Sequence, residues 1–90
     1  MEESKSKFDW NEIITKSVQT SDGKHVGHVD GLTGKNFIVK DKVLHARYYL
    51  VPRDILKSYE HGKVLLNISE DVLNSRYKRD RPGYFDNAMS

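Results

Sequence analysis

The clearest turn in this sequence lies within SDGKHVGHVD, residues 21–30. Asp22-Gly23 is a strong hairpin signal, because a type I′ turn needs positive φ at both of its central residues. In a regular strand after this turn, Val26 and Val29 would point to opposite faces. Gly27 lies between them, and a glycine inside a strand often marks a bulge. A bulge there would bring both valines to the inner face.

Period-two patterning interrupted by turn residues extends outward from this hairpin. It predicts short strands over 18–20, 25–32, 36–40, 47–51, 55–59 and 63–68. Five to six short antiparallel strands in about fifty residues favour a small barrel over an open sheet. Closure removes the strand edges that so short a sheet would leave unpaired. The sequence therefore predicts an all-β fold with a small β-barrel.

Helix signals flank the strands on both sides. Asp9 and Glu12 have the spacing of a capping box and predict a short helix carrying Trp10. Ser69, followed by two acids, predicts a second short helix that ends before Arg81. We expect a flexible leader over 1–8, one domain over 9–79 and a flexible tail over 80–90.

The composition restricts the class of protein. Ninety residues suffice for one domain, and the hydrophobic and charged fractions of 37% and 31% fit neither a disordered tail nor a membrane protein. The longest apolar run, residues 48–51, is far shorter than the ~20 residues of a membrane-spanning helix. The absence of cysteine excludes disulfides and thiol chemistry. We expect a cytoplasmic protein without a membrane span.

Three segments occur in an order and spacing that form a recognisable pattern. Residues 22–29 read D-G-x-x-V-G-x-V, residues 49–52 read Y-x-V-P, and residues 62–68 contain G-x-V-x-L. Together they resemble the PRC-barrel domain over residues 17–73, most closely its small stand-alone bacterial and archaeal branch of uncharacterised function. The segment 41–47 departs from that pattern. The resemblance implies an SH3-like barrel that serves as a docking module and has no enzymatic site.

The sequence offers no convincing catalytic or metal-binding cluster. Two of its histidines are three residues apart on one predicted strand, where regular geometry sends them to opposite faces, and the others fall in separate turns. A serine, aspartate and histidine near the first turn would lie on an exposed hairpin without a cleft. No phosphate-binding glycine loop is present. We expect no enzyme activity, metal, cofactor or small-molecule substrate. The histidines are His25, His28, His45 and His61.

Apolar residues on the outward face of the strands form the first candidate binding surface. If Phe37 and Val39 fill the barrel, Ile38 and Leu65 point outward, together with Tyr48 or Tyr49. An exposed apolar patch of this kind often marks the binding site of a protein partner or of a second copy of the chain. In the alternative interpretation, the terminal helices fold back and cover the patch. The candidate contact residues are Ile38, Tyr49 and Leu65.

A basic segment is the second candidate surface. Residues 76–81 hold four bases and one acid, whereas the whole chain carries a net charge of only +2. Three interpretations of this segment are open. Cations with interleaved aromatic rings could bind RNA, the segment could dock on a protein partner, or it could be a solvated helix end. We expect a non-catalytic protein-binding adaptor, self-associating in one variant of this hypothesis. An RNA- or ribosome-associated factor that uses residues 76–85 is the alternative. The candidate residues here are Arg76, Lys78, Arg79, Arg81, Tyr84 and Phe85.

Overall fold

The computed structural model describes residues 9–41 and 47–79, and most of them lie in strands. The all-β class is therefore confirmed. The predicted leader and tail, residues 1–8 and 80–90, lie outside the described residues. The elements in chain order are η1 (Trp10–Ile13), β1 (Ser17–Gln19), β2 (His25–Thr33), β3 (Asn36–Asp41), β4 (Arg47–Pro52), η2 (Arg53–Ile55), β5 (Leu56–Glu60), β6 (Lys63–Leu66), α2 (Glu70–Arg76) and β7 (Lys78–Arg79).

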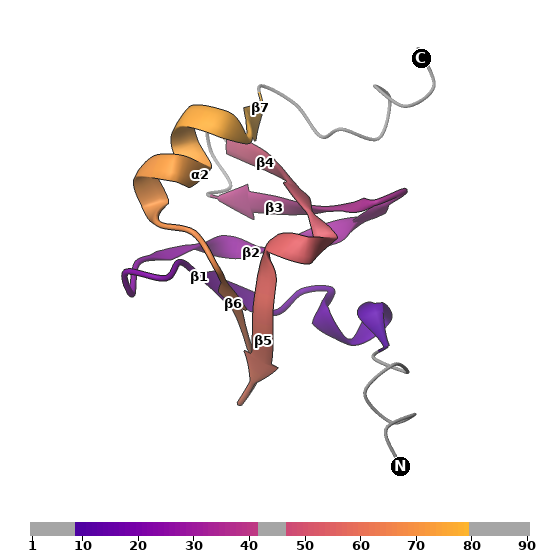
Figure 1. The fold of residues 1–90 in the computed structure, drawn as a ribbon. Helices are drawn as coiled ribbons and strands as arrows, with labels where there is room; N and C mark the ends of the chain where they lie inside the picture. The colour runs from indigo at the N-terminus through magenta and orange to yellow at the C-terminus, as the bar shows by residue number, and fades with distance from the viewer. Residues whose placement is uncertain (1–8, 42–46, 80–90) are drawn as a thin grey trace.

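The strands form one seven-stranded sheet in the order β5-β6-β1-β2-β3-β4-β7. The sheet bends strongly, so that β5 and β6 run steeply across the direction of β2, β3 and β4 (Figure 1). β1 and β6 pair in parallel, so the prediction of antiparallel strands alone is wrong for this pair. The parallel pairing sets Val18 beside Val64, and both valines enter the core. No ladder joins β5 to β7 within the described residues, and the predicted closure of the barrel is not seen there.

Strand β2 contains the predicted bulge at Gly27. Where β2 pairs with β1, Val26 and Gly27 together oppose the single residue Val18. As a result Val26 and Val29 are both buried, as the sequence predicts. Gly27 has φ +109°, and a Cβ added there would lie 2.3 Å from the carbonyl oxygen of Lys40. Only glycine lets β2 approach β3 this closely.

The turn before β2 differs from the predicted type. Of its two central residues, Gly23 has positive φ (+84°) but Asp22 does not, so the turn is not type I′. The Thr20 hydroxyl accepts a hydrogen bond from the Lys24 backbone N–H at 3.1 Å and closes a longer loop. Positive φ at two adjacent residues occurs instead at His61-Gly62, which joins β5 to β6. A turn forms both at Asp22-Gly23 and at His61-Gly62. Positive φ at two adjacent residues, which a type I′ turn requires, occurs only at His61-Gly62 of these two turns.

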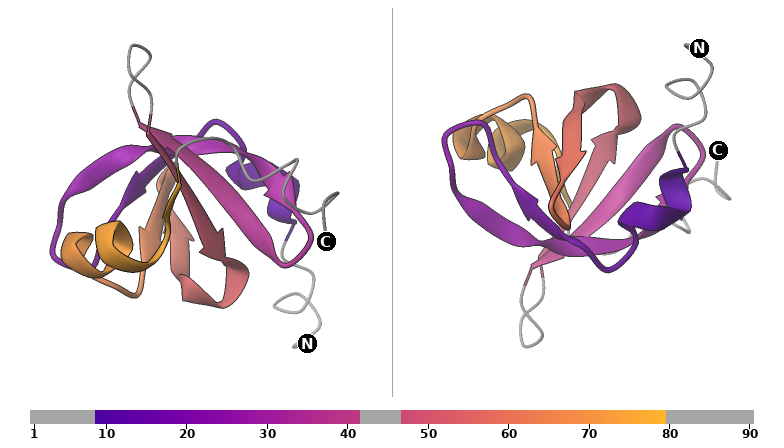
Figure 2. Two further views of the ribbon diagram at one scale, coloured as in Figure 1. Left: turned by 90° about the horizontal axis from the view of Figure 1, so that it is seen from above. Right: turned by 90° about the horizontal axis from the view of Figure 1, so that it is seen from below.

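The core lies inside the bend of the sheet. The two helical elements that flank the sheet, η1 and α2, lie on opposite sides of it (Figure 2). Each contributes one buried residue, Ile13 and Leu73. The terminal helices therefore pack on the core face of the sheet. The interpretation in which they cover the outward patch of Ile38 and Leu65 stays a prediction. The core residues are Ile13, Val18, Val26, Val29, Phe37, Val39, Tyr49, Val51, Val64, Leu66 and Leu73.

Helix α2 begins where the sequence predicts and, as predicted, ends before Arg81. The Ser69 hydroxyl accepts from the Val72 backbone N–H at 3.4 Å and caps its first turn. The helix ends at Arg76, because the chain leaves helical geometry at Tyr77 (φ −119°, ψ 1°). The Tyr77 carbonyl then accepts from the Leu50 N–H at 2.9 Å. This bond starts the pairing of β7 with β4, a strand that the sequence does not reveal.

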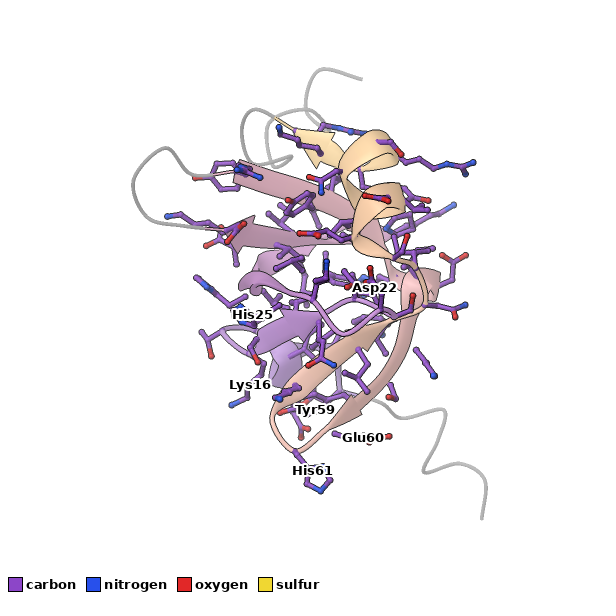
Figure 3. All side chains as sticks on the ribbon, turned by 90° about the vertical axis from the view of Figure 1, so that its left-hand side faces the viewer. Lys16, Asp22, His25, Tyr59, Glu60 and His61 are labelled. Carbon is purple, nitrogen blue, oxygen red and sulfur yellow. The ribbon has the colours of Figure 1, made fainter. Side chains whose placement is uncertain are left out.

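Asp22 connects the β1–β2 turn to the start of α2 (Figure 3). Its carboxylate accepts hydrogen bonds from the Thr20 hydroxyl and, at 3.3 Å, from the backbone N–H of Glu70. The hydrogen bond from Thr20 is the main reason that the pKa of Asp22 lies below its ordinary value of 3.8. Lys24 and Glu70 add an ion pair of 3.7 Å across the same junction. Two elements far apart in sequence are thereby joined at one carboxylate.

We expect the Asp22→Asn variant to be less stable than the wild type at neutral pH. Because the folded pKa is depressed, the ionised carboxylate stabilises the fold above pH 3.8, and this contribution disappears as the pH falls through the folded pKa. Thermal unfolding followed by circular dichroism from pH 7 to pH 2 measures it. The Tm difference between the two proteins should shrink below about pH 4. Asp54→Asn is the control, and an equal pH-dependent loss in that variant would contradict the assignment to Asp22.

Candidate functional site

Four segments bring basic residues to one end of the sheet. β3 ends there, β4 begins there, and α2 leads into β7 beside them, in the upper part of Figure 1. We call this region the basic end. It consists of Lys40, Asp41, Arg47, Tyr48, Arg76, Lys78 and Arg79.

Strand register sets the geometry of the basic end. Lys40 pairs with Tyr48, and Tyr48 pairs in turn with Arg79. Directly paired residues share one face of a sheet, and neighbouring strands are about 4.8 Å apart. The Tyr48 ring therefore lies between two cationic side chains, on the face opposite to the core residue Tyr49. All three side chains are half-buried.

The charge of the molecule is segregated toward this end. Five cations and Asp41 give the basic end a formal charge of +4, and the whole chain carries +2, so all other residues together carry −2. Arg47, Arg76 and Lys78 are exposed. Among the residues that the structure describes, none of the five cations forms an ion pair. No carboxylate in residues 9–41 or 47–79 therefore neutralises these cations by direct ion-pair contact.

The end of α2 holds one of these cations in place. Arg79 donates from Nη1 to the carbonyl oxygen of Lys78 at 2.9 Å and to that of Arg76 at 3.5 Å. Positive charge at the carbonyl end of a helix interacts favourably with the helix dipole. Arg76, Lys78 and Arg79 are thus grouped by the end of the short helix α2 and by the short strand β7, which the sequence did not predict.

Tyr49 was predicted to lie on an outer apolar surface, and this prediction is wrong. Its side chain is only 1% exposed and belongs to the core. Its hydroxyl donates to Oδ1 of Asn74 at 3.1 Å, and Nδ2 of Asn74 donates to the Glu70 carbonyl at 3.1 Å. Burial raises the pKa of the Tyr49 phenol above its ordinary value of 10.0. Tyr49 therefore anchors α2 on the sheet beneath the basic end.

Ile38 also differs from its prediction. It is fully buried (0% exposed), although it points away from the neighbouring core residues Phe37 and Val39. The alternation of side chains along β3 correctly predicted that Ile38 lies on the face opposite to Phe37 and Val39. It could not predict that Ile38 is buried, because alternation does not show what covers a face. Leu65 is half-buried on the outer face of β6, where it pairs with Ser58 and Gln19. The predicted surface of Ile38, Tyr49 and Leu65 is therefore not an exposed apolar patch.

Four members of the basic end were not predicted as part of a basic surface: Lys40, Asp41, Arg47 and Tyr48. All four lie within two residues of the segment 42–46, whose sequence pattern is irregular. The signal that places them is the pairing of β3 with β4, which sets Asp41 opposite Arg47 and Lys40 opposite Tyr48. The other predicted residues of the basic segment, Arg81, Tyr84 and Phe85, lie outside the described residues.

The histidines and helices of the described part add no further site. His25 and His28 are both exposed and pair with Gln19 and Ser17, so the bulge places them on one face of β2, and the prediction of opposite faces is wrong. His61 lies at the tip of the β5–β6 turn, far from His25 in Figure 3. Within residues 9–41 and 47–79, no group of three or more histidines and carboxylates has the arrangement of a metal site. No helix in these ranges is long and apolar enough to span a membrane. Comparisons with protein-family models, curated proteins and solved structures give no match.

Proposed function

We propose that this chain is a non-catalytic binding module that contacts single-stranded RNA through its basic end. The observation that carries the proposal is the segregation of charge: +4 at the basic end against −2 elsewhere. Affinity for nucleic acid comes mainly from cations that neutralise phosphates. This favours the alternative of the sequence analysis, an RNA- or ribosome-associated factor, and extends its surface to β3 and β4.

The arrangement of Lys40, Tyr48 and Arg79 favours a single strand over a duplex. Aromatic rings on a sheet face stack with unpaired bases, while flanking cations contact the backbone. Tyr48 stands between two cations on neighbouring strands and supplies such a ring. A duplex would offer phosphates but no free base for the ring.

A protein-binding adaptor is the second candidate function. Two of the three residues of its predicted apolar surface, Ile38 and Tyr49, are buried, so a protein partner would need an acidic surface to fit the basic end. The partial exposure of Leu65 is too small a surface to carry docking or self-association alone. Both candidates use the same cations, and the test below separates them.

RNA binding can be measured by fluorescence anisotropy with a labelled single-stranded RNA of about twelve nucleotides, within the usual site sizes. Five phosphate contacts should give a salt slope of about −3.5, so affinity should fall roughly a hundredfold between 50 and 200 mM salt. The double variant Arg76→Gln/Lys78→Gln should bind more weakly and reduce the slope by about 1.4. Tyr48→Leu should weaken binding without changing the slope.

The double variant Lys57→Gln/Lys63→Gln is the matched control, because it removes the same charge from exposed positions on β5 and β6. It should retain wild-type affinity. Equal losses in both double variants, or no RNA binding at about 50 mM salt, would contradict the proposal. An acidic protein that the wild type retains after nuclease treatment, and that Arg76→Gln/Lys78→Gln does not retain, would favour the adaptor instead.

The finer fold assignment and the location belong to the same proposal. The bulged hairpin around Gly27 and the strongly bent sheet support membership of the PRC-barrel family. Superposition of an experimentally determined structure on that family's barrels tests it. The cysteine-free composition fits the proposed cytoplasmic location.

A further inference from the structure

A hollow lies at the opposite end of the β3–β4 hairpin from the basic end. It has a volume of about 600 Å³ and opens to solvent between the β2–β3 turn and the junction of β4 with η2. Asn36 and Lys40 are four residues apart on β3, so the two sites are separated by about 13 Å along the strand. The residues that line the hollow are Gly34, Lys35, Asn36, Pro52, Arg53 and Asp54.

The Arg53 side chain is fixed before any ligand arrives. Its guanidinium carbon lies 5.0 Å from the centre of the Trp10 ring, a cation–π contact. Trp10 in turn packs against buried Phe37, with ring centres 6.0 Å apart. Nε of Arg53 donates to the Asn36 carbonyl at 3.3 Å, and its backbone N–H donates to the Lys35 carbonyl at 2.9 Å. The guanidinium is therefore held by a ring and by a backbone carbonyl.

Within the described ranges, these contacts leave part of the guanidinium without a hydrogen-bond partner. The structure gives Nη1 and Nη2 of Arg53 no hydrogen bond to any residue in 9–41 or 47–79. Both nitrogens carry donors in a planar fork that matches an oxyanion with two oxygens. Holding an arginine in place beforehand reduces the rotamer entropy that is lost on binding. Arg53 is thus arranged as an anion receptor.

We propose that this hollow binds a phosphate monoester carried by a hydroxyl-bearing small molecule. The Arg53 fork and the nearby Lys35 supply two positive charges for a phosphate that carries about −1.5 to −2. Asp54 is exposed on the same rim. It repels excess negative charge and can accept a hydrogen bond from a hydroxyl of the ligand. Ribose phosphates and nucleotides share this chemistry. The site is separate from the basic end and does not depend on RNA binding.

Trp10 is the only tryptophan of the chain and contacts the proposed receptor directly. Its fluorescence can therefore report binding. The probes are inorganic phosphate, ribose 5-phosphate, adenosine monophosphate and acetate, each titrated at constant ionic strength. We expect saturable changes with the phosphate monoesters and none with acetate. Tighter binding of adenosine monophosphate than of ribose 5-phosphate identifies a nucleotide ligand, and equal binding identifies a sugar phosphate.

Three variants test the residues. Arg53→Lys keeps the charge but loses the fork, and affinity should fall roughly tenfold or more. Lys35→Gln should weaken binding less. Asp54→Asn should strengthen phosphate binding about threefold by removing a repulsive charge, an effect that damage to the fold cannot mimic. Amide chemical shifts of Lys35 and Asn36 provide a second readout that does not depend on Trp10.

The control is Arg76→Gln/Lys78→Gln, which should leave the response of Trp10 to phosphate monoesters unchanged even if it abolishes RNA binding. Conversely, Arg53→Lys should leave the anisotropy signal with RNA unchanged. Equal changes with acetate and phosphate monoesters would overturn the proposal, as would no response at millimolar ligand. An affinity that is unaffected by both Arg53→Lys and Asp54→Asn would also overturn it.

Discussion

The Gly27→Ala variant is expected to lose a large part of the stability of the fold. The added Cβ would lie 2.3 Å from the Lys40 carbonyl oxygen and 2.9 Å from the carbonyl carbon, and both atoms belong to the backbone of β3. Relief requires the two strands to move apart, which disrupts the pairing beside the bulge. The φ of +109° adds strain for any residue with a Cβ. Strain and overpacking together should cost about 3–5 kcal/mol.

Chemical denaturation of wild type and variant measures this loss, which corresponds to a decrease in Tm of roughly 20 °C for a domain of this size. Gly23→Ala is the matched control. Gly23 also has positive φ (+84°), but an added Cβ there meets nothing within 4 Å. It should cost only about 1–2 kcal/mol. If both variants lost the same stability, backbone strain would explain the whole effect, and the close approach to Lys40 would be irrelevant.

The Tyr49→Ala variant should have an effect of similar size. Tyr49 is among the largest fully buried side chains, and its removal leaves a cavity under α2. Replacing a buried aromatic residue with alanine costs about 3–5 kcal/mol. Tyr49→Phe keeps the ring but leaves Oδ1 of Asn74 without its donor, and it should cost about 1 kcal/mol. Denaturation curves of the two variants separate the contribution of the ring from that of the hydroxyl.

The same tyrosine gives the fold a dependence on alkaline pH. The folded pKa is raised by burial, so above pH 10 the unfolded chain releases the phenolic proton while the folded chain keeps it. The contribution of neutral Tyr49 is complete below pH 10.0 and decreases as the pH rises toward the folded pKa. Tyr49→Phe should lack this component. If Tyr49→Ala were as stable as the wild type and lost only binding, the assignment of Tyr49 to the core would be contradicted. Tyr49 would then belong to an exposed binding surface.

Local sequence signals predicted the strands well. Period-two patterning placed six strands, and the signal at Gly27 predicted a bulge that the register confirms. Ser69 and Asp9 marked the starts of the two helical elements. These features depend on residues close together in the chain, so a short window of sequence contains the information.

Features that depend on distant residues were not predictable in the same way. The short strand β7 forms because Tyr77 and Leu50 meet through a backbone hydrogen bond, and neither residue type favours that pairing by itself. Tyr49 and Tyr48 are adjacent and chemically identical, and only the register decides that Tyr49 enters the core. Prediction of the candidate site from the sequence was limited in the same way. Arg76, Lys78 and Arg79 were recognised as a basic run, whereas Lys40 and Arg47 joined them only through strand pairing.

The parallel pairing of β1 with β6 determines how late this protein can finish folding. Ser17 pairs with Lys63, so this edge of β1 can pair only after β6 has formed, more than forty residues further along the chain. β1 is also the only strand that connects the β5–β6 hairpin to the rest of the sheet within the described residues. Contacts so distant in sequence slow folding, because the intervening loop must close first. During synthesis, strands β1 to β4 emerge first, and the outer edge of β1 stays unpaired until β6 leaves the ribosome. That interval is when the nascent chain is most exposed to aggregation and to chaperones.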